Sequence, residues 1–198
     1  MSKRLFDLAG AALGLLLCAP LFALAALAIK LDSPGPVFFR QVRVGRHGRP
    51  FRIHKFRSMR ARQPAGARPI TVGGDPRITR VGGVLRRWKL DELPQLIDVL
   101  AGSMSLVGPR PEVPEYVALY PEDLRRVVLS VRPGITDPAS IRFRDENALL
   151  AGAADPEACY RERILPEKLR LQAEYVRGRS FAGDLRILFQ TFAKIATA

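Results

Sequence analysis

The amino-acid sequence predicts an α+β fold: an N-terminal membrane helix, a small β-hairpin or sheet, and several amphipathic helices near the membrane interface. Three features of the 198-residue chain support this prediction. An uncharged apolar run extends from Leu8 to Ile29. Two stretches rich in β-branched and aromatic residues follow it, and apolar residues then recur at helical spacing.

Basic residues flank the apolar run on both sides. Lys3 and Arg4 precede it, and the segment from Ser33 to Gly74 carries many Lys and Arg residues but no Asp or Glu. Since basic flanks favour the cytoplasmic side of a membrane, both ends of the run favour the same side. A re-entrant helix satisfies both flanks by entering the membrane, breaking at Ala19-Pro20 and leaving on the side of entry, because proline favours a kink.

Two other interpretations of the apolar run stay open at this point. The run is long enough to cross a bilayer as one helix. Ala26-Leu27-Ala28 also has the small-x-small pattern of a signal-peptide cleavage site. Charge and Pro20 favour the re-entrant helix over each of these. We therefore divide the chain into a membrane unit, 1–32, and a cytosolic unit at the membrane interface, 33–198.

A β-hairpin is predicted directly after the double-proline segment Asp32–Pro36. Its strands are Val37–Val44 and Phe51–Arg57, and Gly45-Arg46-His47-Gly48 forms the turn. We expect most of its basic residues to attract an anionic lipid membrane, at about 1 kcal/mol per residue. A mobile loop is predicted at Gln63–Gly74.

Two basic residues at the end of this hairpin, Lys55 and Arg57, are the ones expected to face a ligand. Nucleic acid is not an expected partner of the basic residues, because no zinc-finger spacing, RNP motif or clear recognition helix accompanies them.

Two adjacent carboxylates, Asp91 and Glu92, precede a predicted helix. Leu93, Leu96, Ile97 and Leu100 have the spacing of one helix face. Asp91 suits the N-cap of this helix, and an ordinary cap is the simplest interpretation. The free N–H groups of a helix N-terminus also attract phosphate.

The basic residues just upstream, Arg86, Arg87 and Lys89, are expected to keep Asp91 ionised and therefore nucleophilic. Arg110, fixed between Pro109 and Pro111, suits a bidentate clamp on phosphoryl oxygens. The adjacent carboxylates Asp91 and Glu92 also suit Mg²⁺, which binds through one or two carboxylates plus substrate phosphates. A carboxylate nucleophile, a metal and an arginine clamp are together the parts of a phosphoryl-transfer site.

Helices are predicted for the C-terminal third. One starts at Asp155-Pro156 and runs to Tyr175, with Pro166 as an interruption. Another covers Asp184–Ile195 and is amphipathic. Core packing is the main expectation for this last helix, and contact with the membrane surface is the alternative, because Arg186 and Lys194 flank its apolar side.

Short motifs in order along nearly the whole chain resemble the bacterial sugar transferase family, the monotopic polyprenol-phosphate phosphoglycosyl transferases that initiate glycoconjugate and exopolysaccharide assembly. The matching segments are Lys3-Arg4-Leu5-Phe6-Asp7, Leu31-Asp32-Ser33-Pro34-Gly35-Pro36-Val37-Phe38-Phe39-Arg40-Gln41, Lys55-Phe56-Arg57-Ser58-Met59, Asp75-Pro76-Arg77-Ile78-Thr79, Leu90-Asp91-Glu92-Leu93-Pro94-Gln95-Leu96, Val107-Gly108-Pro109-Arg110-Pro111 and Arg132-Pro133-Gly134-Ile135-Thr136. Each motif is weak alone, and their shared order and spacing make the resemblance specific.

The resemblance implies an activity and roles for individual residues. Enzymes of this family transfer a sugar 1-phosphate from a UDP-sugar to undecaprenyl phosphate and release UMP. Asp91 would form a covalent phosphosugar intermediate, and Glu92 would be its partner toward Mg²⁺. Arg110, Lys55 and Arg86 would hold phosphates.

The family resemblance also implies the re-entrant helix–break–helix, with both termini and the active site at the cytoplasmic face of the inner membrane. The other function class that the sequence allows is a non-catalytic polybasic membrane anchor or scaffold. A homo-oligomer stays open.

Three departures from the family pattern are evident. Ala19 stands before Pro20 where many members have serine. The loop after Met59 lacks the acidic residues common there. After Thr136 the sequence is Asp137-Pro138-Ala139-Ser140 in place of the commoner glycine-aromatic-x-Gln run, which leaves the identity of the sugar open.

Overall fold

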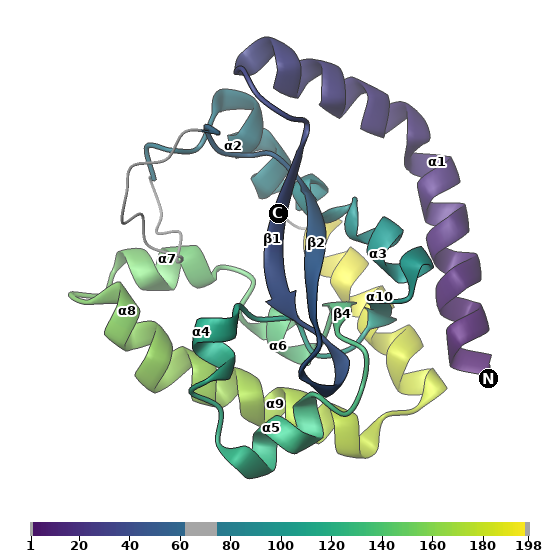
Figure 1. Ribbon diagram of the computed structural model, residues 1–198, viewed down its shortest axis with the longest axis vertical. Coiled ribbons are helices and arrows are strands. Elements are labelled where there is room, and N and C mark those ends of the chain that lie inside the picture. The colour runs from purple at the N-terminus through teal and green to yellow at the C-terminus, as the bar shows by residue number, and fades with distance from the viewer. Residues whose placement is uncertain (1, 62–74, 197–198) are drawn as a thin grey trace.

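A long apolar helix runs along one side and the top of the molecule, and shorter helices surround the central β-hairpin (Figure 1). The structure, a computed structural model, describes residues 2–61 and 75–196. Helix α1 (Ser2–Asp32) precedes the strands β1 (Phe38–Val44) and β2 (Pro50–Phe56). This mixture of helices and small sheet confirms the α+β prediction. The predicted loop Gln63–Gly74 lies outside the described residues.

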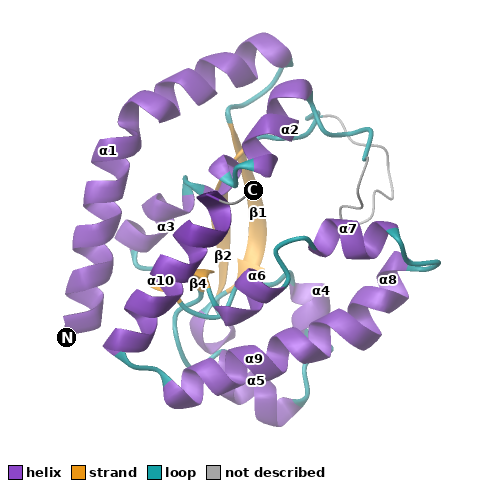
Figure 2. Ribbon diagram, turned by 180° about the vertical axis from the view of Figure 1, so that it is seen from behind, coloured by secondary structure: helices purple, strands orange, loops and turns teal. Residues whose placement is uncertain are grey.

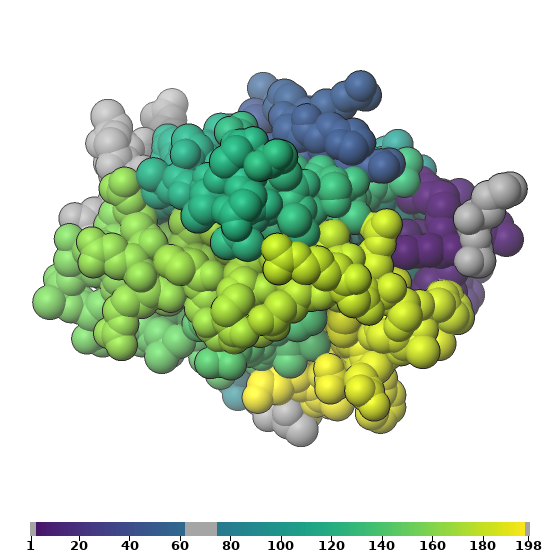
Figure 3. Space-filling view, turned by 90° about the horizontal axis from the view of Figure 1, so that it is seen from below, coloured from purple at the N-terminus to yellow at the C-terminus, as the bar shows by residue number. Residues whose placement is uncertain are grey.

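Most elements after the hairpin are short helices. In chain order they are α2 (Arg80–Arg87), the 3₁₀ turn η2 (Leu90–Glu92), α3 (Gln95–Ala101), β3 (Ser105–Val107), α4 (Pro114–Val117), α5 (Glu122–Val128), β4 (Gly134–Thr136), α6 (Pro138–Arg142), α7 (Glu146–Ala151), α8 (Pro156–Cys159), the π-helical turn η3 (Tyr160–Ile164), α9 (Leu165–Gly178) and α10 (Phe181–Ala196). Seen from below, the C-terminal helices form a continuous layer beside the N-terminal end of α1 (Figure 3).

The predicted hairpin is confirmed, with strand ends that differ from the prediction by at most one residue. β1 and β2 pair antiparallel from Phe38 opposite Phe56 to Val44 opposite Pro50. The turn η1 (Arg46–Gly48) joins them, and His47 adopts a left-handed conformation with φ of 58°. Because the strands are rich in β-branched and aromatic residues, they suit a pleated, half-buried sheet.

A second, parallel sheet brings two distant loops together. Ser105 of β3 lies opposite Gly134 of β4, and Val107 lies opposite Thr136. A Cβ added to Gly134 would lie 2.1 Å from the backbone nitrogen of Gly108, so only glycine permits this approach. The pairing fixes the loop after β3 beside the loop after β4.

Helix α1 is continuous through Ala19 and Pro20, so the predicted break is not an interruption of the helix. The helix instead bends, running up one side of the molecule and then across the top (Figure 1). Proline lacks an N–H and its ring crowds the preceding turn, which is sufficient to bend a helix without ending it. Among the described residues, α1 is the one helix long and apolar enough to cross a membrane, by length and composition alone.

The N-terminal end of α1 is tied to the body by buried polar groups. Lys3 Nζ lies 2.7 Å from the Asp184 carboxylate of α10. The Ser105 hydroxyl of β3 donates to the buried Asp7 carboxylate at 2.8 Å. Together these contacts join α1 to α10 and β3.

The C-terminal end of α1 is tied to the body by Arg57. Its buried guanidinium donates to the backbone oxygens of Ile29 at 3.2 Å and Ser33 at 2.6 Å, and also to that of Pro34. The last carbonyls of a helix have no partner within the helix, so an arginine placed there satisfies them. The prediction that Arg57 faces a ligand is therefore wrong. Gly35, with φ of 127°, makes room for the guanidinium.

The predicted helix from Asp155 to Tyr175 is present in three continuous parts. The Asp155 carboxylate accepts from the backbone nitrogens of Glu157 and Ala158 and so caps α8. The π-helical turn η3 then precedes α9, whose second residue is Pro166. A wider turn before a proline accommodates its missing N–H, which accounts for the predicted interruption.

Helix α10 packs on the body by one face only. Asp184 and Ile187 are buried, whereas Phe189 is 76% exposed and Phe192 is 69% exposed. Figure 2 shows α3 between α1 and α10. Core packing therefore accounts for one side of α10, and its outer side presents large aromatic side chains.

We predict that Arg57→Ala destabilises the fold by about 2–4 kcal/mol, because three backbone carbonyls at the end of α1 lose a charged donor at once. Urea unfolding in detergent micelles measures the change. Arg49→Ala is the matched control, since Arg49 is exposed. Equal stability of the two variants would contradict the assigned role of Arg57.

Candidate active site

Asp91 lies inside a short helical turn and is not a helix cap. The turn η2 begins after Lys89, which has a left-handed conformation with φ of 55°, and α3 begins only at Gln95, after Pro94. The N-cap prediction for Asp91 is therefore wrong, because the left-handed residue starts the turn before Asp91. The Asp91 side chain is 7% exposed and makes no hydrogen bond or ion pair within residues 2–61 and 75–196. The Asp91 carboxylate is therefore buried and has no polar partner in the described part of the chain.

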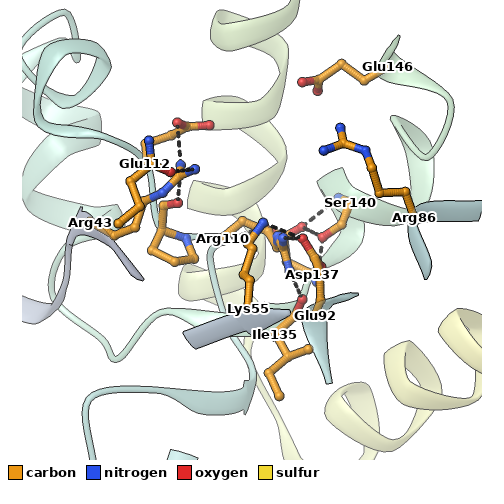
Figure 4. Close-up of polar contacts among 12 residues, drawn as sticks. Arg43, Lys55, Arg86, Glu92, Arg110, Glu112, Ile135, Asp137, Ser140 and Glu146 are labelled. Atoms are coloured by element: carbon orange, nitrogen blue, oxygen red, sulfur yellow. Dashed lines mark hydrogen bonds and ion pairs between the residues drawn. The ribbon is translucent and has the colours of Figure 1, made fainter. Parts of the chain in front are cut away.

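Glu92, by contrast, is held by two cations. Its Oε1 atom accepts from Lys55 Nζ at 2.8 Å and from Arg110 Nη2 at 2.6 Å. Lys55 comes from β2 and Arg110 from the loop after β3, so one carboxylate oxygen joins three segments (Figure 4). Arg110 and Glu92, predicted as neighbours in one site, are in direct contact.

Arg110 is fixed by its backbone as well as by its side chain. Its guanidinium donates to the backbone oxygen of Ile135, and its backbone nitrogen donates to Asp137 Oδ2 at 2.9 Å. The fully buried Asp137 carboxylate also accepts from Ser140 N at 2.6 Å and from Gln172 Nε2 at 2.8 Å. The rigid presentation predicted for Arg110 is present, and it depends on Asp137 as well as on the flanking prolines.

The pKa values of the adjacent carboxylates Asp91 and Glu92 are shifted in opposite directions. Burial by itself would raise the pKa of Glu92, but Arg110 and Lys55 outweigh it and hold that pKa well below its usual value. Burial raises the pKa of Asp91, and the charge of Glu92 adds to the rise. The nearby basic residues do favour the Asp91 anion, as expected, but the net shift of the Asp91 pKa is upward. Lys55 and Arg86 do attract Asp91, but they offset only part of the rise.

Asp91 opens onto a cavity of about 670 Å³. The cations Lys55, Arg86 and Arg110 line it, as predicted, while Arg57 does not. Arg86 comes from α2, and its guanidinium lies 3.5 Å from the Ser58 hydroxyl. A carboxylate without partners, surrounded by cations in a concave site, suits a reaction on an anionic phosphate.

Other cavity residues were not predicted as ligands from the sequence. Lys89 lines the cavity, and its left-handed backbone is the kind of strain found at functional sites. Arg43 and Glu112 line it too. Glu112 directly follows Pro111 in the motif of Arg110, a proximity that could have identified it. Arg43 is one of many basic hairpin residues, and no sequence signal separates it from the rest.

Asp91 and Glu92 have the donor set for a divalent cation that takes its other ligands from substrate. Neither the Asp91 carboxylate nor Glu92 Oε2 makes a hydrogen bond to the described part of the chain. No group of three or more His, Cys, Asp or Glu that could hold a metal occurs among those residues. Mg²⁺ often binds through one or two carboxylates plus substrate phosphates, so these residues fit it.

The family model for the bacterial sugar transferases matches residues 1–198. The chain belongs to this family. A UDP-glucose:undecaprenyl-phosphate glucose-1-phosphate transferase of Caulobacter vibrioides is 40% identical over 100% of this chain and 70% of its own length. An exopolysaccharide production protein, PSS, of Rhizobium leguminosarum bv. phaseoli is 42% identical over 96% of this chain and 92% of its own.

The chain covers a smaller share of a relative whose name gives another sugar. A UDP-N-acetylgalactosamine-undecaprenyl-phosphate N-acetylgalactosaminephosphotransferase of Aeromonas hydrophila is 39% identical over 98% of this chain. The chain spans 44% of that protein. These relatives confirm the resemblance inferred from the motifs and establish the chain as a sugar transferase.

We predict that Glu92→Gln destabilises this transferase by about 1–3 kcal/mol at pH 7, because Lys55 and Arg110 are left without their shared anion. A group with a lowered folded pKa stabilises above its unfolded pKa and loses that contribution as pH falls through the folded pKa. The difference from wild type should therefore be constant from pH 8 to pH 6 and shrink below about pH 4.5. Denaturant unfolding across this range measures it, and a difference that grows toward acid would contradict the charge assignment.

Proposed function

We propose that this sugar transferase moves a sugar 1-phosphate from a UDP-sugar to undecaprenyl phosphate and releases UMP, as the first membrane step of glycan assembly. The observation that carries the proposal is the buried, unbonded Asp91 carboxylate in a cavity lined by Lys55, Arg86 and Arg110. The names of the Caulobacter and Aeromonas relatives support the donor and acceptor classes. They name different sugars, so the donor is proposed as a UDP-sugar without further identity.

Asp91 acts as the nucleophile in the proposed reaction. A carboxylate oxygen of Asp91 attacks the β-phosphorus, and the bond from that phosphorus to the oxygen bridging the α-phosphate breaks. UMP leaves with the bridging oxygen, and the sugar phosphate stays on Asp91. A phosphate oxygen of the acceptor then attacks the same phosphorus, which restores the Asp91 carboxylate and gives the lipid diphosphosugar.

The raised pKa of Asp91 suits this role, because a more basic carboxylate is a better nucleophile once it is ionised. Glu92 holds Lys55 and Arg110 beside the reacting phosphates, where their charges oppose the negative charge of the transition state. Mg²⁺ would be held by Asp91 and Glu92 and would neutralise diphosphate charge.

An apolar side of the same cavity suits the isoprenoid chain of the acceptor. Its residues come mainly from α1, α3 and α10, and Figure 2 shows α3 between the other two helices. The residues on this side are Phe6, Gly10, Gly14 and Cys18 of α1, Leu93, Leu96, and Leu188, Phe192 and Ile195 of α10. A lipid phosphate placed at Asp91 can therefore extend its chain away from the cations into an apolar channel.

The attachments of α1 support a monotopic arrangement at the cytoplasmic face of the inner membrane. Lys3 and Asp7 fix its N-terminal end to the body, and Arg57 fixes its C-terminal end to the same body. A helix that crossed the bilayer would separate these ends by the thickness of the membrane, about 30 Å of hydrocarbon. The exposed leucines of α1, the outer aromatics of α10 and the basic hairpin then contact lipid.

We predict that Asp91→Asn lowers UMP release from a UDP-sugar by about 10³-fold or more, because the nucleophile is lost. Asp123→Asn, on the exposed surface of α5, is the matched control and should retain full activity. Both variants should sediment with membranes, and mass spectrometry of the wild type with donor alone should find a phosphosugar on Asp91. Full activity of Asp91→Asn would exclude the covalent mechanism. A wild type that binds membranes but releases no UMP from any UDP-sugar would favour the anchor or scaffold.

We predict that residues 2 and 198 lie on the same side of the membrane. Single cysteines at these positions, in a variant with Cys18→Ser and Cys159→Ser, should react with an impermeant maleimide only when the cytoplasmic face is accessible. Inside-out and right-side-out vesicles provide the two orientations. Labelling of the two positions from opposite sides would exclude the re-entrant helix.

A further inference from the structure

The cavity that contains Asp91 extends past Arg110 to a second polar surface. We call this surface the distal wall, and it consists of Arg43, Glu112, Tyr116, Glu146, Tyr160 and Lys168. The residues come from β1, the loop after β3, α4, α7, η3 and α9. Figure 4 shows Arg43 and Glu112 to one side of Arg110, with Glu146 on another side of the view.

Hydrogen-bond donors and acceptors alternate along the distal wall. Glu112 Oε1 accepts from the Tyr160 hydroxyl at 2.5 Å, and Glu112 Oε2 lies 3.3 Å from Arg43 Nη1. Lys168 Nζ lies 2.5 Å from Glu146 and 5.0 Å from the centre of the Tyr160 ring. Carboxylates, cations and a tyrosine therefore line one cavity.

Two further observations mark the distal wall as more than a structural network. The Nε atom of Arg43 is buried and has no hydrogen-bond partner in the described structure, although a buried polar atom normally has one. Tyr160 begins the π-helical turn η3, and such turns occur frequently at functional sites. Both observations concern residues that contact Glu112.

The chemistry of the distal wall matches hydroxyl groups better than the other parts of a UDP-sugar. Glu112 and Glu146 would repel a phosphate. Uracil offers mainly carbonyl acceptors, which a carboxylate cannot bind. Sugar hydroxyls donate and accept, so they can pair with the carboxylates and with Arg43 or Lys168.

We infer that the distal wall binds the hexosyl group of the UDP-sugar, and that Glu112 and Tyr160 determine which sugar is accepted. This inference rests on the proposed function. Burial would raise the pKa of Glu112, but Lys168 and Arg43 lower it, so Glu112 remains an acceptor. Burial and the nearby Glu112 raise the pKa of Tyr160, so its hydroxyl remains a donor.

The test compares Glu112→Gln and Tyr160→Phe with wild type on a panel of UDP-hexoses that differ at single hydroxyls. We expect KM for the preferred donor to rise about tenfold or more, and the preference among epimers to fall, because a site built to bind a hydroxyl loses its partner. The inhibition constant for UMP, which lacks the hexosyl group, should change less than about twofold. Glu115→Gln, an exposed change on α4, is the matched control.

An unchanged epimer preference in both folded variants would overturn the inference. An equal loss of UMP affinity would also overturn it, because the wall would then bind the nucleotide. Thermal unfolding identifies a variant that fails to fold, and Tyr160→Phe keeps the ring in place should Glu112→Gln unfold. Failure of the proposed function has a different result, since the wild type itself would then release no UMP from any donor.

Discussion

The shared Glu92 oxygen is the interaction on which the active site depends. Lys55 on β2 and Arg110 after β3 are remote in sequence, and both donate to it. The hairpin, the η2 turn and the parallel β3–β4 pair are thereby held around one anion. Taking three charged groups out of water is costly unless their geometry satisfies them, so this contact requires accurate placement of each segment. Asp137 supplies part of that placement by binding the Arg110 backbone.

The same contact explains why adjacent carboxylates behave differently. Glu92 binds Lys55 and Arg110, and its negative charge raises the pKa of Asp91 at the preceding position in the chain. Asp91 is left buried, without a hydrogen bond and with a raised pKa. Neighbouring titratable groups whose pKa values are pushed apart are typical of acid–base and nucleophilic sites. The proposed division of roles between Asp91 and Glu92 therefore follows from the positions of Lys55 and Arg110.

The sequence was sufficient to predict features that depend on local pattern. The hairpin follows from strand composition, and the partnership of Asp91, Glu92 and Arg110 follows from motifs with a known family spacing. Features that depend on tertiary contacts were not predictable. The prediction that Arg57 faces a ligand is wrong, because its contact with the carbonyls at the end of α1 depends on how the helix packs. The cap assignment for Asp91 failed because a left-handed Lys89 starts the turn earlier, and nothing in the residue type lysine indicates that conformation.

The departure from the family pattern at Asp137-Pro138-Ala139-Ser140 can now be interpreted in physical terms. Asp137 is fully buried, caps α6 through Ser140 and supports Arg110, so its side chain is occupied by the protein itself. Because the Asp137 carboxylate already accepts several hydrogen bonds within the protein, it has little capacity left to bind a sugar hydroxyl. Under the proposed function, the choice of sugar falls to cavity residues whose hydrogen bonds are unsatisfied or can be exchanged, and Arg43 beside Glu112 is such a place. Position 137 then acts on the site through the Arg110 backbone, and the proposed sugar-selecting residues lie on the opposite side of the same arginine.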